Sequence, residues 1–259
     1  MSNMGTEGQG AGQVALVTGA TRGIGRAIAF GLAAEGADVA ICARDAKAVA
    51  ATVDELKAKG VKAFGQPLDV ADGPKLRSFV DTVANHFGGL DILVCNTSAM
   101  AEGSDEANFR KAFDVDILHT LNAVTAALPH LEKSKAAAII AISSISGSED
   151  YGYAGVSYGT MKAALLFYMK SLARHVAPMG IRANVVSPGT TYFNGGFWHD
   201  VEVNDPKGFA ATLAENPMGR MATPEEIANA VVFLASPAAS FIAGSNLVVD
   251  GTLTKRIQL

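Results

Sequence analysis

The chain has 259 residues, of which 49% are hydrophobic and 18% charged, and its formal net charge is −4. This length and composition fit one large α/β domain with a substantial core and exclude wholesale disorder. The slightly acidic balance, without any basic block, argues against nucleic-acid binding, and no apolar run approaches the roughly 20 residues that cross a bilayer.

Residues 1–13 are Gly-rich and polar, and they lack the basic start and apolar middle of a secretion signal. We interpret them as a flexible tail before a single domain that spans residues 14–259. Cys42 and Cys95 each lie in an apolar, strand-like run, which is typical of small core residues. Together these features predict a cytoplasmic protein without a metal site.

From residue 14 onward, short apolar runs alternate with longer amphipathic stretches. The runs predict strands at 14–18, 38–43, 62–64, 90–95, 137–143, 181–186 and 247–249. The stretches predict helices at 25–35, 46–59, 74–87, 108–131, 157–177 and 223–235. Strands that are apolar on both faces and separated by helices indicate a single-domain Rossmann fold, a doubly wound parallel sheet of about seven strands with helices on both faces. Residues 190–221 lack clear periodicity, and we expect them to form a substrate lid.

A glycine-rich turn, Thr18-Gly19-Ala20-Thr21-Arg22-Gly23-Ile24-Gly25, follows the first strand directly. Such glycines let a tight turn bring backbone N–H groups and a helix N-terminus to a pyrophosphate. No Lys-Ser or Lys-Thr pair follows, which excludes a nucleoside-triphosphate loop. The turn resembles the cofactor turn of classical short-chain dehydrogenases/reductases, and the resemblance continues to the C-terminus. It implies that the cofactor contacts Gly19, Thr21, Arg22, Gly23, Ile24 and Gly25.

The choice of nicotinamide cofactor depends on the end of the second strand, where an acidic residue would bind the ribose hydroxyls of NAD. Here that strand ends in Ala43 followed by Arg44, and Arg22 lies within the glycine turn. Because guanidinium groups match phosphate with paired donors, two arginines near the 2′ position favour NADP(H) over NAD(H). Either arginine could instead be an ordinary surface charge, and the neighbouring Asp45 weakens the preference.

Three further segments resemble the family's cofactor-binding pattern. Asp69-Val70, after the third strand, looks like its adenine contact. Asn96 resembles the Asn of the family's Asn-Asn-Ala-Gly motif, although this chain has Cys95-Asn96-Thr97-Ser98. After the sixth strand, Pro188-Gly189 followed by Thr190 or Thr191 is similar to the segment that flanks the nicotinamide carboxamide, and we expect Thr191 to contact it.

Tyr158 and Lys162 are four residues apart at the start of a predicted helix, so their side chains share one face. Ser143 and Ser144 end the fifth strand, at the sheet edge where the glycine turn also lies. Carbonyl reduction needs an acid that delivers a proton as hydride arrives, and a nearby ammonium favours ionisation of a tyrosine. The resemblance implies that Tyr158 is the acid/base, that Lys162 activates it and binds the nicotinamide ribose, and that a serine orients the carbonyl.

The family's Ser-x-x-Gly pattern assigns the serine role to Ser144, with Ser143 and Ser146 as alternatives. The interval from Ser144 to Tyr158 is one residue longer than the family's common spacing, which suggests a small insertion within residues 147–156.

Asp116 stands where the family usually has an Asn that is thought to hold a water in the proton relay. Because Asp can keep the main-chain contact, we expect activity to survive. The charge of Asp116 could alter the titration of the Lys162–Tyr158 pair, or the residue could simply be a solvated helix charge.

Residues 149–156 and 192–209 would select the substrate. Their aromatic side chains predict a largely apolar pocket for a cyclic, aromatic or acyl ketone, although they could equally be packing under a lid. The predicted substrate contacts are Ser144, Tyr151, Tyr153, Phe193, Phe197 and Trp198.

Three functions are compatible with these motifs. The first is an NADP-dependent reductase of ketones, and the second is a 3-oxoacyl-ACP (thioester) reductase of fatty-acid synthesis, which would favour a basic surface for acyl carrier protein. The third is an inactive NADP-binding sensor or scaffold, against which the retained Ser144, Tyr158 and Lys162 argue.

The resemblance also implies a homotetramer that pairs the two long helices. Small side chains permit close approach of helices. The candidate faces are Ala123, Ala126 and Ala127 on the first long helix, and Ala163, Ala164 and Phe167 on the second. Both sets could instead face the chain's own sheet.

Overall fold

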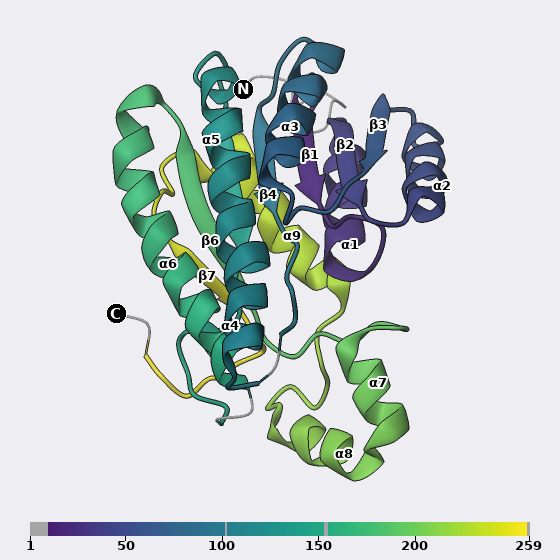
Figure 1. Cartoon of the computed structure of the whole chain (residues 1–259), viewed down its shortest axis with the longest axis vertical. Helices are drawn as coiled ribbons and strands as arrows, with labels where there is room; N and C mark the ends of the chain where they lie inside the picture. Colours follow the sequence, from purple (N-terminus) through teal and green to yellow (C-terminus); the bar gives the residue numbers. More distant parts are fainter. Residues whose placement is uncertain (1–9, 102, 153–154, 258–259) are drawn as a thin grey trace, which may run out of the picture.

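The computed structural model describes residues 10–101, 103–152 and 155–257 (Figure 1). Within these ranges the strands form one parallel sheet in the order β3-β2-β1-β4-β5-β6-β7. They are β1 (Val14–Thr18), β2 (Asp38–Ala43), β3 (Ala63–Pro67), β4 (Ile92–Cys95), β5 (Ala138–Ile142), β6 (Arg182–Pro188) and β7 (Asn246–Val249). The strand order reverses between β1 and β4, and open α/β sheets bind ligands beyond the strand ends at such a point.

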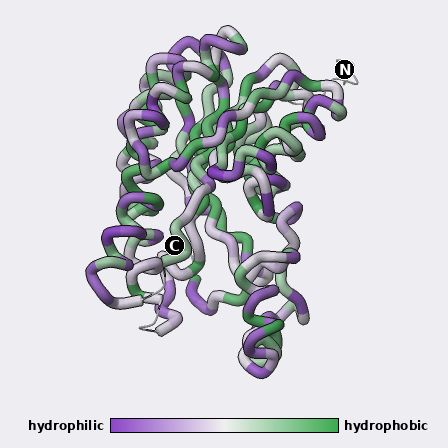
Figure 2. Tube along the Cα trace, turned by 45° about the vertical axis from the view of Figure 1, so that its right-hand side comes forward, coloured by the Kyte–Doolittle hydropathy of each residue, from purple (hydrophilic) through white to green (hydrophobic). Residues whose placement is uncertain are grey.

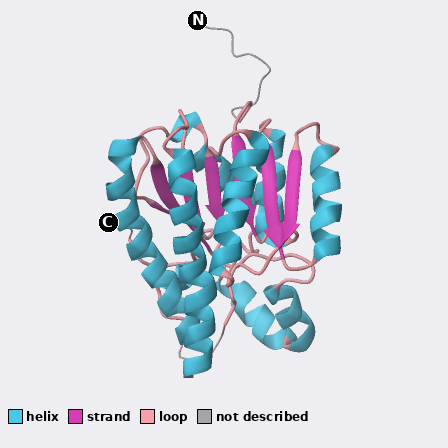
Figure 3. Ribbon diagram, turned by 45° about the horizontal axis from the view of Figure 1, so that its top comes forward, coloured by secondary structure: helices cyan, strands magenta, loops and turns pink. Residues whose placement is uncertain are grey.

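Helices cover both faces of the sheet (Figure 3). One face carries α3 (Gly73–Phe87), α5 (His119–Leu131) and α6 (Val156–Val176), and the other carries α1 (Gly23–Ala34), α2 (Ala46–Lys57) and α9 (Pro224–Ala235). Along β1 the side chains alternate between the two cores, with Leu16 on the α3 side and Val17 on the α1 side. Figure 2 shows the hydrophobic strands at the centre and the more hydrophilic helices outside. The predicted fold class is therefore confirmed.

Side-chain caps fix where several helices begin. Asp45, Asp72 and Asp105 accept hydrogen bonds from first-turn N–H groups of α2, α3 and α4 (Glu106–Ala112), and Thr223 forms a capping box with Glu226 at α9. Each such cap stabilises its helix by about 1 kcal/mol. In contrast, α1 begins without a side-chain cap, so its first N–H groups have no side-chain partner at the sheet edge.

The predicted helix 108–131 is divided into three parts. α4 is followed by a π-helical turn, η1 (Phe113–Leu118), and then by α5. A π-helical turn widens the helix locally and often occurs at functional sites. Asp116 lies within this turn and is 1% exposed, so it is not the solvated helix charge that the sequence allowed.

The predicted lid, residues 190–221, contains two helices, α7 (Phe197–Asn204) and α8 (Pro206–Glu215). In Figure 1 they form a lobe beyond the end of the sheet. Neither helix has a buried residue, so neither shows the apolar stripe by which an amphipathic helix is recognised in a sequence. Only the start of α8 has a local signal in the sequence. The Asp205 side chain accepts a hydrogen bond from Gly208 N–H, and Pro206 occupies the first helical position.

The last residues of the predicted tail contact the domain. Gly10 N–H donates to Glu35 O at 2.9 Å, and Gln13 N–H donates to Gly10 O at 2.9 Å. Residues 1–9 lie outside the described part of the chain.

The described residues contain neither a disulfide nor a helix that could span a membrane. Cys42 and Cys95 are buried free thiols, as predicted, and burial raises the pKa of each to about 12. No helix in these ranges is both long and apolar enough to cross a bilayer.

Candidate active site

An open cleft of about 1820 Å³ follows the edge of the sheet at which the strands end. The glycine turn lines one part of the cleft, and Ser144, Tyr158 and Lys162 line another. The cleft therefore brings together two groups of residues that lie more than a hundred positions apart in the chain.

The glycine turn is closed by Asn96, at the end of β4. Asn96 Nδ2 donates to Thr18 O at 2.9 Å and to Gly19 O at 3.2 Å. A Cβ on Gly25 would lie 2.3 Å from Gly19 O and 2.4 Å from Asn96 Nδ2, so no larger residue fits there. The amide of Asn96 thus positions the turn that was predicted to bind the pyrophosphate.

The turn and the uncapped start of α1 fit a dinucleotide phosphate. Thr21, Arg22, Ile24 and Gly25 line the cleft beside that helix end, where unpaired N–H groups and the helix dipole favour an anion. The cleft residues therefore suit the cofactor that the sequence predicts.

The two predicted phosphate-binding arginines differ in their present contacts. Arg44 lines the cleft just after β2 and has no hydrogen bond or ion pair among the described residues, whereas Arg22 Nη1 donates to Gly195 O at 2.9 Å. Asp45 uses a carboxylate oxygen to accept from Lys47 and Ala48 N–H as the cap of α2.

The other predicted cofactor contacts also line the cleft. Asp69 and Val70 follow β3, and Asp69 Oδ1 accepts from Ala71 N–H at 3.0 Å. Pro188 ends β6, and Gly189 and Thr191 follow it, on the opposite side of the sheet's switch point from β3. Both flanks of the cleft therefore carry predicted contacts.

Lys162 and Asp116 form a buried ion pair. Lys162 Nζ lies 3.0 Å from Asp116 Oδ1, and the two side chains are 2% and 0% exposed. Lys162 Nζ also donates to Ile142 O at 3.0 Å and lies 5.5 Å from the ring centre of Tyr158. Burial alone would lower the pKa of Lys162, but the charges of Asp116 and Tyr158 outweigh burial and raise it. Lys162 is therefore held as an ammonium beside the tyrosine.

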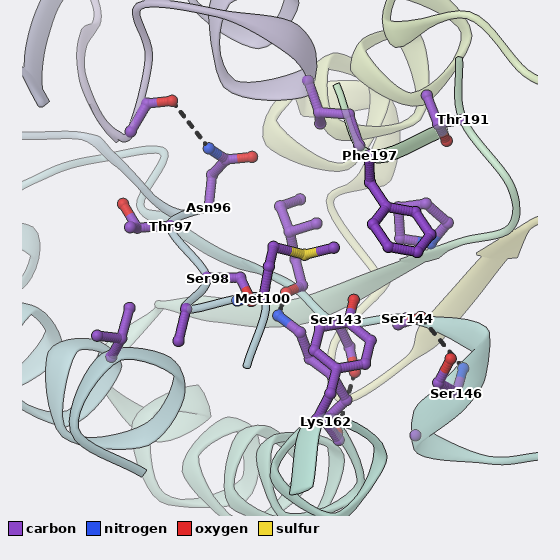
Figure 4. Close-up of a pocket in the computed structure, with 18 of the residues that line it drawn as sticks. Asn96, Thr97, Ser98, Met100, Ser143, Ser144, Ser146, Lys162, Thr191 and Phe197 are labelled. Atoms are coloured by element: carbon purple, nitrogen blue, oxygen red, sulfur yellow. Dashed lines mark hydrogen bonds between the residues drawn. The ribbon is translucent and has the colours of Figure 1, made fainter. Parts of the chain in front are cut away.

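The hydroxyl groups of the candidate serines have different partners (Figure 4). Ser143 Oγ donates to Lys162 O at 3.0 Å, so its proton is already used within the fold. Ser144 Oγ accepts from Ser146 N–H at 3.1 Å, which leaves its proton available for a ligand. Both serines line the cleft, and the hydrogen bonds favour Ser144 as the one that contacts a carbonyl.

Two glycines let the Ser144 segment approach α6 closely. A Cβ on Gly147 would lie 2.7 Å from the carbonyl carbon of Lys162, and one on Gly159 would lie 2.9 Å from Ser146 O. The Ser-x-x-Gly spacing thus has a physical basis, because its glycine allows η2 (Ile145–Gly147) to pack directly on the backbone of Lys162.

The predicted substrate contacts occupy different places. Tyr151, Phe197 and Trp198 line the cleft, and the rings of Phe197 and Trp198 meet edge to face with centres 5.1 Å apart. Phe193 also lines the cleft, and it packs on the glycine turn, where a Cβ on Gly23 would lie only 2.5 Å from its ring. Tyr153 lies outside the described residues.

Met100 is a cleft residue that the sequence analysis missed. It has a backbone φ of 45°, a left-handed conformation that is unusual for a residue other than glycine, and its side chain is 47% exposed in the cleft (Figure 4). Ser98 Oγ accepts from Met100 N–H at 3.2 Å, and Asp116 Oδ2 accepts from Ala99 N–H at 3.1 Å. No sequence pattern marks a strained backbone, so only the structure could find it.

His119 is a second missed residue near the site, one turn beyond Asp116. It is 1% exposed, and its Nδ1 lies 3.1 Å from Val115 O, while its Nε2 has no hydrogen-bond partner among the described residues. Burial lowers the pKa of His119 to about 4, despite the opposing effects of Val115 O and Asp116. The imidazole is therefore neutral at pH 7.

Comparison with known proteins identifies the family of the chain. The family model described as Enoyl-(Acyl carrier protein) reductase, adh_short_C2, matches residues 19–254. The chain is 36% identical over 241 residues to isoepoxydon dehydrogenase patN of Penicillium expansum, an alignment that covers 91% of this chain and 92% of the relative. It is also 36% identical over 243 residues to 3-oxoacyl-(acyl-carrier-protein) reductase FabG of Staphylococcus aureus, covering 92% and 96%.

Among solved structures, L-sorbose reductase from Gluconobacter frateurii, complexed with NADPH and L-sorbose, superimposes with a TM-score of 0.89. The match covers 95% of this chain and 98% of that one, at 31% sequence identity. The family model, the full-length relatives and the fold agree, and the chain belongs to the classical short-chain dehydrogenase/reductase family, whose members are NAD(P)-dependent oxidoreductases that act on alcohol and carbonyl groups.

Proposed function

We propose that the chain is an NADP-dependent reductase that moves hydride between NADPH and a ketone, or in reverse from a secondary alcohol. One observation carries this proposal: Ser144, Tyr158 and the buried ammonium of Lys162 line the same cleft as the open glycine turn. The similarity to L-sorbose reductase, which was crystallised with NADPH and a sugar ketone, supports it.

The chemistry is divided between the cofactor and the side chains. When bound, the cofactor supplies the hydride. Tyr158 Oη donates a proton to the oxygen of the reacting carbonyl, and the free Ser144 hydroxyl donates a hydrogen bond to the same oxygen. The ammonium of Lys162 stabilises the phenolate that remains until a proton returns from solvent, and it is placed to hold the ribose of the cofactor.

Asp116 acts in this scheme as a positioning residue. Its carboxylate, which is itself buried, keeps Lys162 charged, and it also accepts a hydrogen bond from Ala99 N–H, which anchors that loop. In the family's usual arrangement an Asn stands at this place, so here a direct ion pair supports the lysine.

The preference for NADP(H) over NAD(H) is assigned to Arg44 and Arg22. Arg44 is free to pair with a 2′-phosphate, and Asp45, the acidic neighbour, is occupied as the cap of α2. Arg44→Ala should weaken NADPH binding at least about tenfold and leave NADH binding nearly unchanged, because a phosphate–guanidinium pair contributes more than 1 kcal/mol. If a fluorescence titration shows equal losses of affinity for NADPH and NADH, Arg44 does not select the cofactor.

We further propose that the enzyme is a cytoplasmic homotetramer. Ala123 and Ala127 are buried in the chain's own core, so the first predicted face is wrong. On α6, however, Phe167 is 78% exposed, and Ala163 and Ala164 beside it are also exposed, which leaves an apolar face for a second copy. Light scattering of Phe167→Asp should give a smaller assembly than the wild type, and an unchanged mass would contradict this interface.

The experiment that tests the function measures NADPH consumption with cyclic and aryl ketones beside a 3-oxoacyl thioester. Tyr158→Phe should abolish turnover, and Ser144→Ala should lower kcat about a hundredfold. Ser146→Ala is the matched control, since Ser146 lines the same cleft and contributes its backbone N–H to Ser144.

The FabG relative favours a second function, 3-oxoacyl-ACP reduction, and turnover of the thioester alone would establish it over the first. Full activity of Tyr158→Phe would refute both.

A further inference from the structure

The substrate end of the cleft has an acidic rim, which we define as Glu149, Asp150 and Glu215. All three line the cleft. Glu149 and Asp150 belong to the loop after η2, and Glu215 is the last residue of α8 in the lid. The rim is therefore built from two segments that enclose the same opening.

Tyr151 shows that these carboxylates share one environment. Its hydroxyl donates to Glu149 Oε2 at 3.1 Å. Burial raises the pKa of Tyr151, and the charges of Glu149, Asp250 and Glu215 raise it further. Tyr151 therefore has negatively charged surroundings, and the carboxylate that it contacts is that of Glu149.

The charge of the rim is not neutralised by partners in the fold. Within residues 10–101, 103–152 and 155–257, none of the three carboxylates has an ion-pair partner within 4.0 Å. Glu149 Oε1 accepts from the backbone N–H of Lys255 at 3.1 Å, which fixes the carboxylate in place without cancelling its charge.

Among the described residues, two basic side chains near the rim do not line the cleft. Lys255 and Arg256 are exposed on the C-terminal segment, where Arg256 Nη1 contacts Ser148 O at 3.5 Å, and neither lines the cleft. Lys111 does line it, but so does Asp114, three residues further along the chain, and their charges offset each other. The rim therefore leaves an excess of negative charge at the substrate entrance.

Apolar side chains line the same cleft as the rim. Met100, Phe197, Trp198 and Leu253 do so, together with the hydroxyl-bearing Ser144 and Tyr158. These apolar side chains offer no cationic partner to an anionic substituent. The negative charges of the rim would therefore repel such a substituent, most strongly at low ionic strength.

We infer that the substrates of this enzyme are electroneutral ketones, and that the acidic rim rejects ketones that carry an anionic group near the carbonyl. The inference rests on the proposed ketone reductase activity and specifies its substrate class. It also accounts for how this cleft would disfavour acyl chains delivered on phosphorylated carriers.

The test compares two ketones that differ by one charge and little volume, 4-oxocyclohexane-1-carboxamide and 4-oxocyclohexane-1-carboxylate. We expect kcat/KM with NADPH to be at least about tenfold higher for the carboxamide. Raising the salt concentration from about 0.01 M to about 1 M shortens the Debye length from about 30 Å to about 3 Å, and it should narrow the ratio. A ratio near one in low salt would overturn the inference and leave the reductase activity standing.

A binding measurement separates this inference from the proposed chemistry. Trp198 is the single tryptophan of the chain and lines the cleft, so its fluorescence reports ligand binding without turnover when NADP⁺ is saturating. The carboxamide should bind at least about tenfold more tightly than the carboxylate even to Tyr158→Phe. Equal dissociation constants would overturn the selection by charge, whereas loss of turnover with unequal binding bears on the chemistry alone.

Matched variants locate the effect at the rim. In the double variant Glu149→Gln/Glu215→Gln the ratio between the two ketones should fall about fivefold, because two of the three rim charges are removed. Glu132→Gln, at the exposed end of α5, changes the net charge at a distance from the cleft and should leave the ratio unchanged. An equal change in both variants, or no change in the double variant, would contradict the assignment to the rim.

Discussion

Lys162 Nζ and Asp116 Oδ1 lie 3.0 Å apart, and neither side chain is more than 2% exposed. The pair joins α6 to the π-helical turn η1, while the other carboxylate oxygen of Asp116 holds Ala99 N–H at 3.1 Å. One carboxylate therefore holds both the ammonium beside Tyr158 and the loop of Ala99, which lines the cleft.

Asp116→Asn should destabilise the protein by about 3 kcal/mol at pH 7, because it leaves a buried ammonium without its counter-charge. Lys162→Met should cost a similar amount, and the double variant should regain part of the loss. Since the folded-state pKa of Lys162 is raised, the pair's contribution is complete below about pH 10 and is lost only as pH rises beyond that. Urea unfolding of the three variants checks this, and strictly additive losses would show that the two groups are not coupled.

His119 should make the fold sensitive to mild acid. Its pKa falls from 6.5 to about 4 in the folded state, so the native protein binds fewer protons than the unfolded chain between these values. The associated stability is present above pH 6.5 and is lost as pH falls toward 4, by up to about 3 kcal/mol. His119→Asn, whose amide can still donate to Val115 O, should lose less stability between pH 7 and pH 4.5. Parallel acid profiles for the two proteins would contradict this.

Gly23→Ala should weaken NADPH binding and folding together. The new Cβ would lie 2.5 Å from the ring of Phe193, at a backbone φ of 53°. Gly60→Ala is the control for backbone strain alone, since Gly60 has a φ of 89° and nothing within 4 Å of the added carbon. We expect Gly60→Ala to lower the free energy of unfolding by about 1 kcal/mol, and Gly23→Ala to lower it clearly more. Adding Phe193→Ala to Gly23→Ala should restore only the difference between these two losses. Equal costs at both glycines would mean that the lid does not rest on the turn.

Replacing Met100 should separate backbone strain from substrate fit. Met100→Gly and Met100→Ala both remove the thioether from the cleft, but only glycine adopts a φ of 45° without strain. The glycine variant should therefore be the more stable of the two by about 1 kcal/mol. Both should lower KM for ketones larger than cyclohexanone and change kcat much less. An alanine variant as stable as the glycine variant would remove the strain argument.

Much of the fold follows from local features of the sequence. The apolar runs that contain Cys42 and Cys95 could only be strands covered on both faces, and the parallel order of the sheet follows from the helices between them. The positions of Tyr158 and Lys162 follow equally directly, since four residues on a helix fix a shared face. These inferences needed no knowledge of contacts between distant segments.

What could not be predicted depends on such distant contacts. Phe193 is one of several lid aromatics in the sequence, and only the folded chain shows that its ring rests on Gly23. Arg22 likewise contacts Gly195 O, 173 residues away. The burial of Asp116 depends on a π-helical turn, which leaves no mark on a hydrophobic pattern of helical period. The helices α7 and α8 have no buried face that a pattern could reveal.

Because no residue of α7 or α8 is fully buried, substitutions on these two helices should cost less folding free energy than substitutions in the sheet. The two helices can therefore change while the sheet and the residues at its edge stay fixed. For protein engineering, residues 197–215 are accordingly the first segment to exchange for the corresponding segment of another family member when a new selectivity is sought.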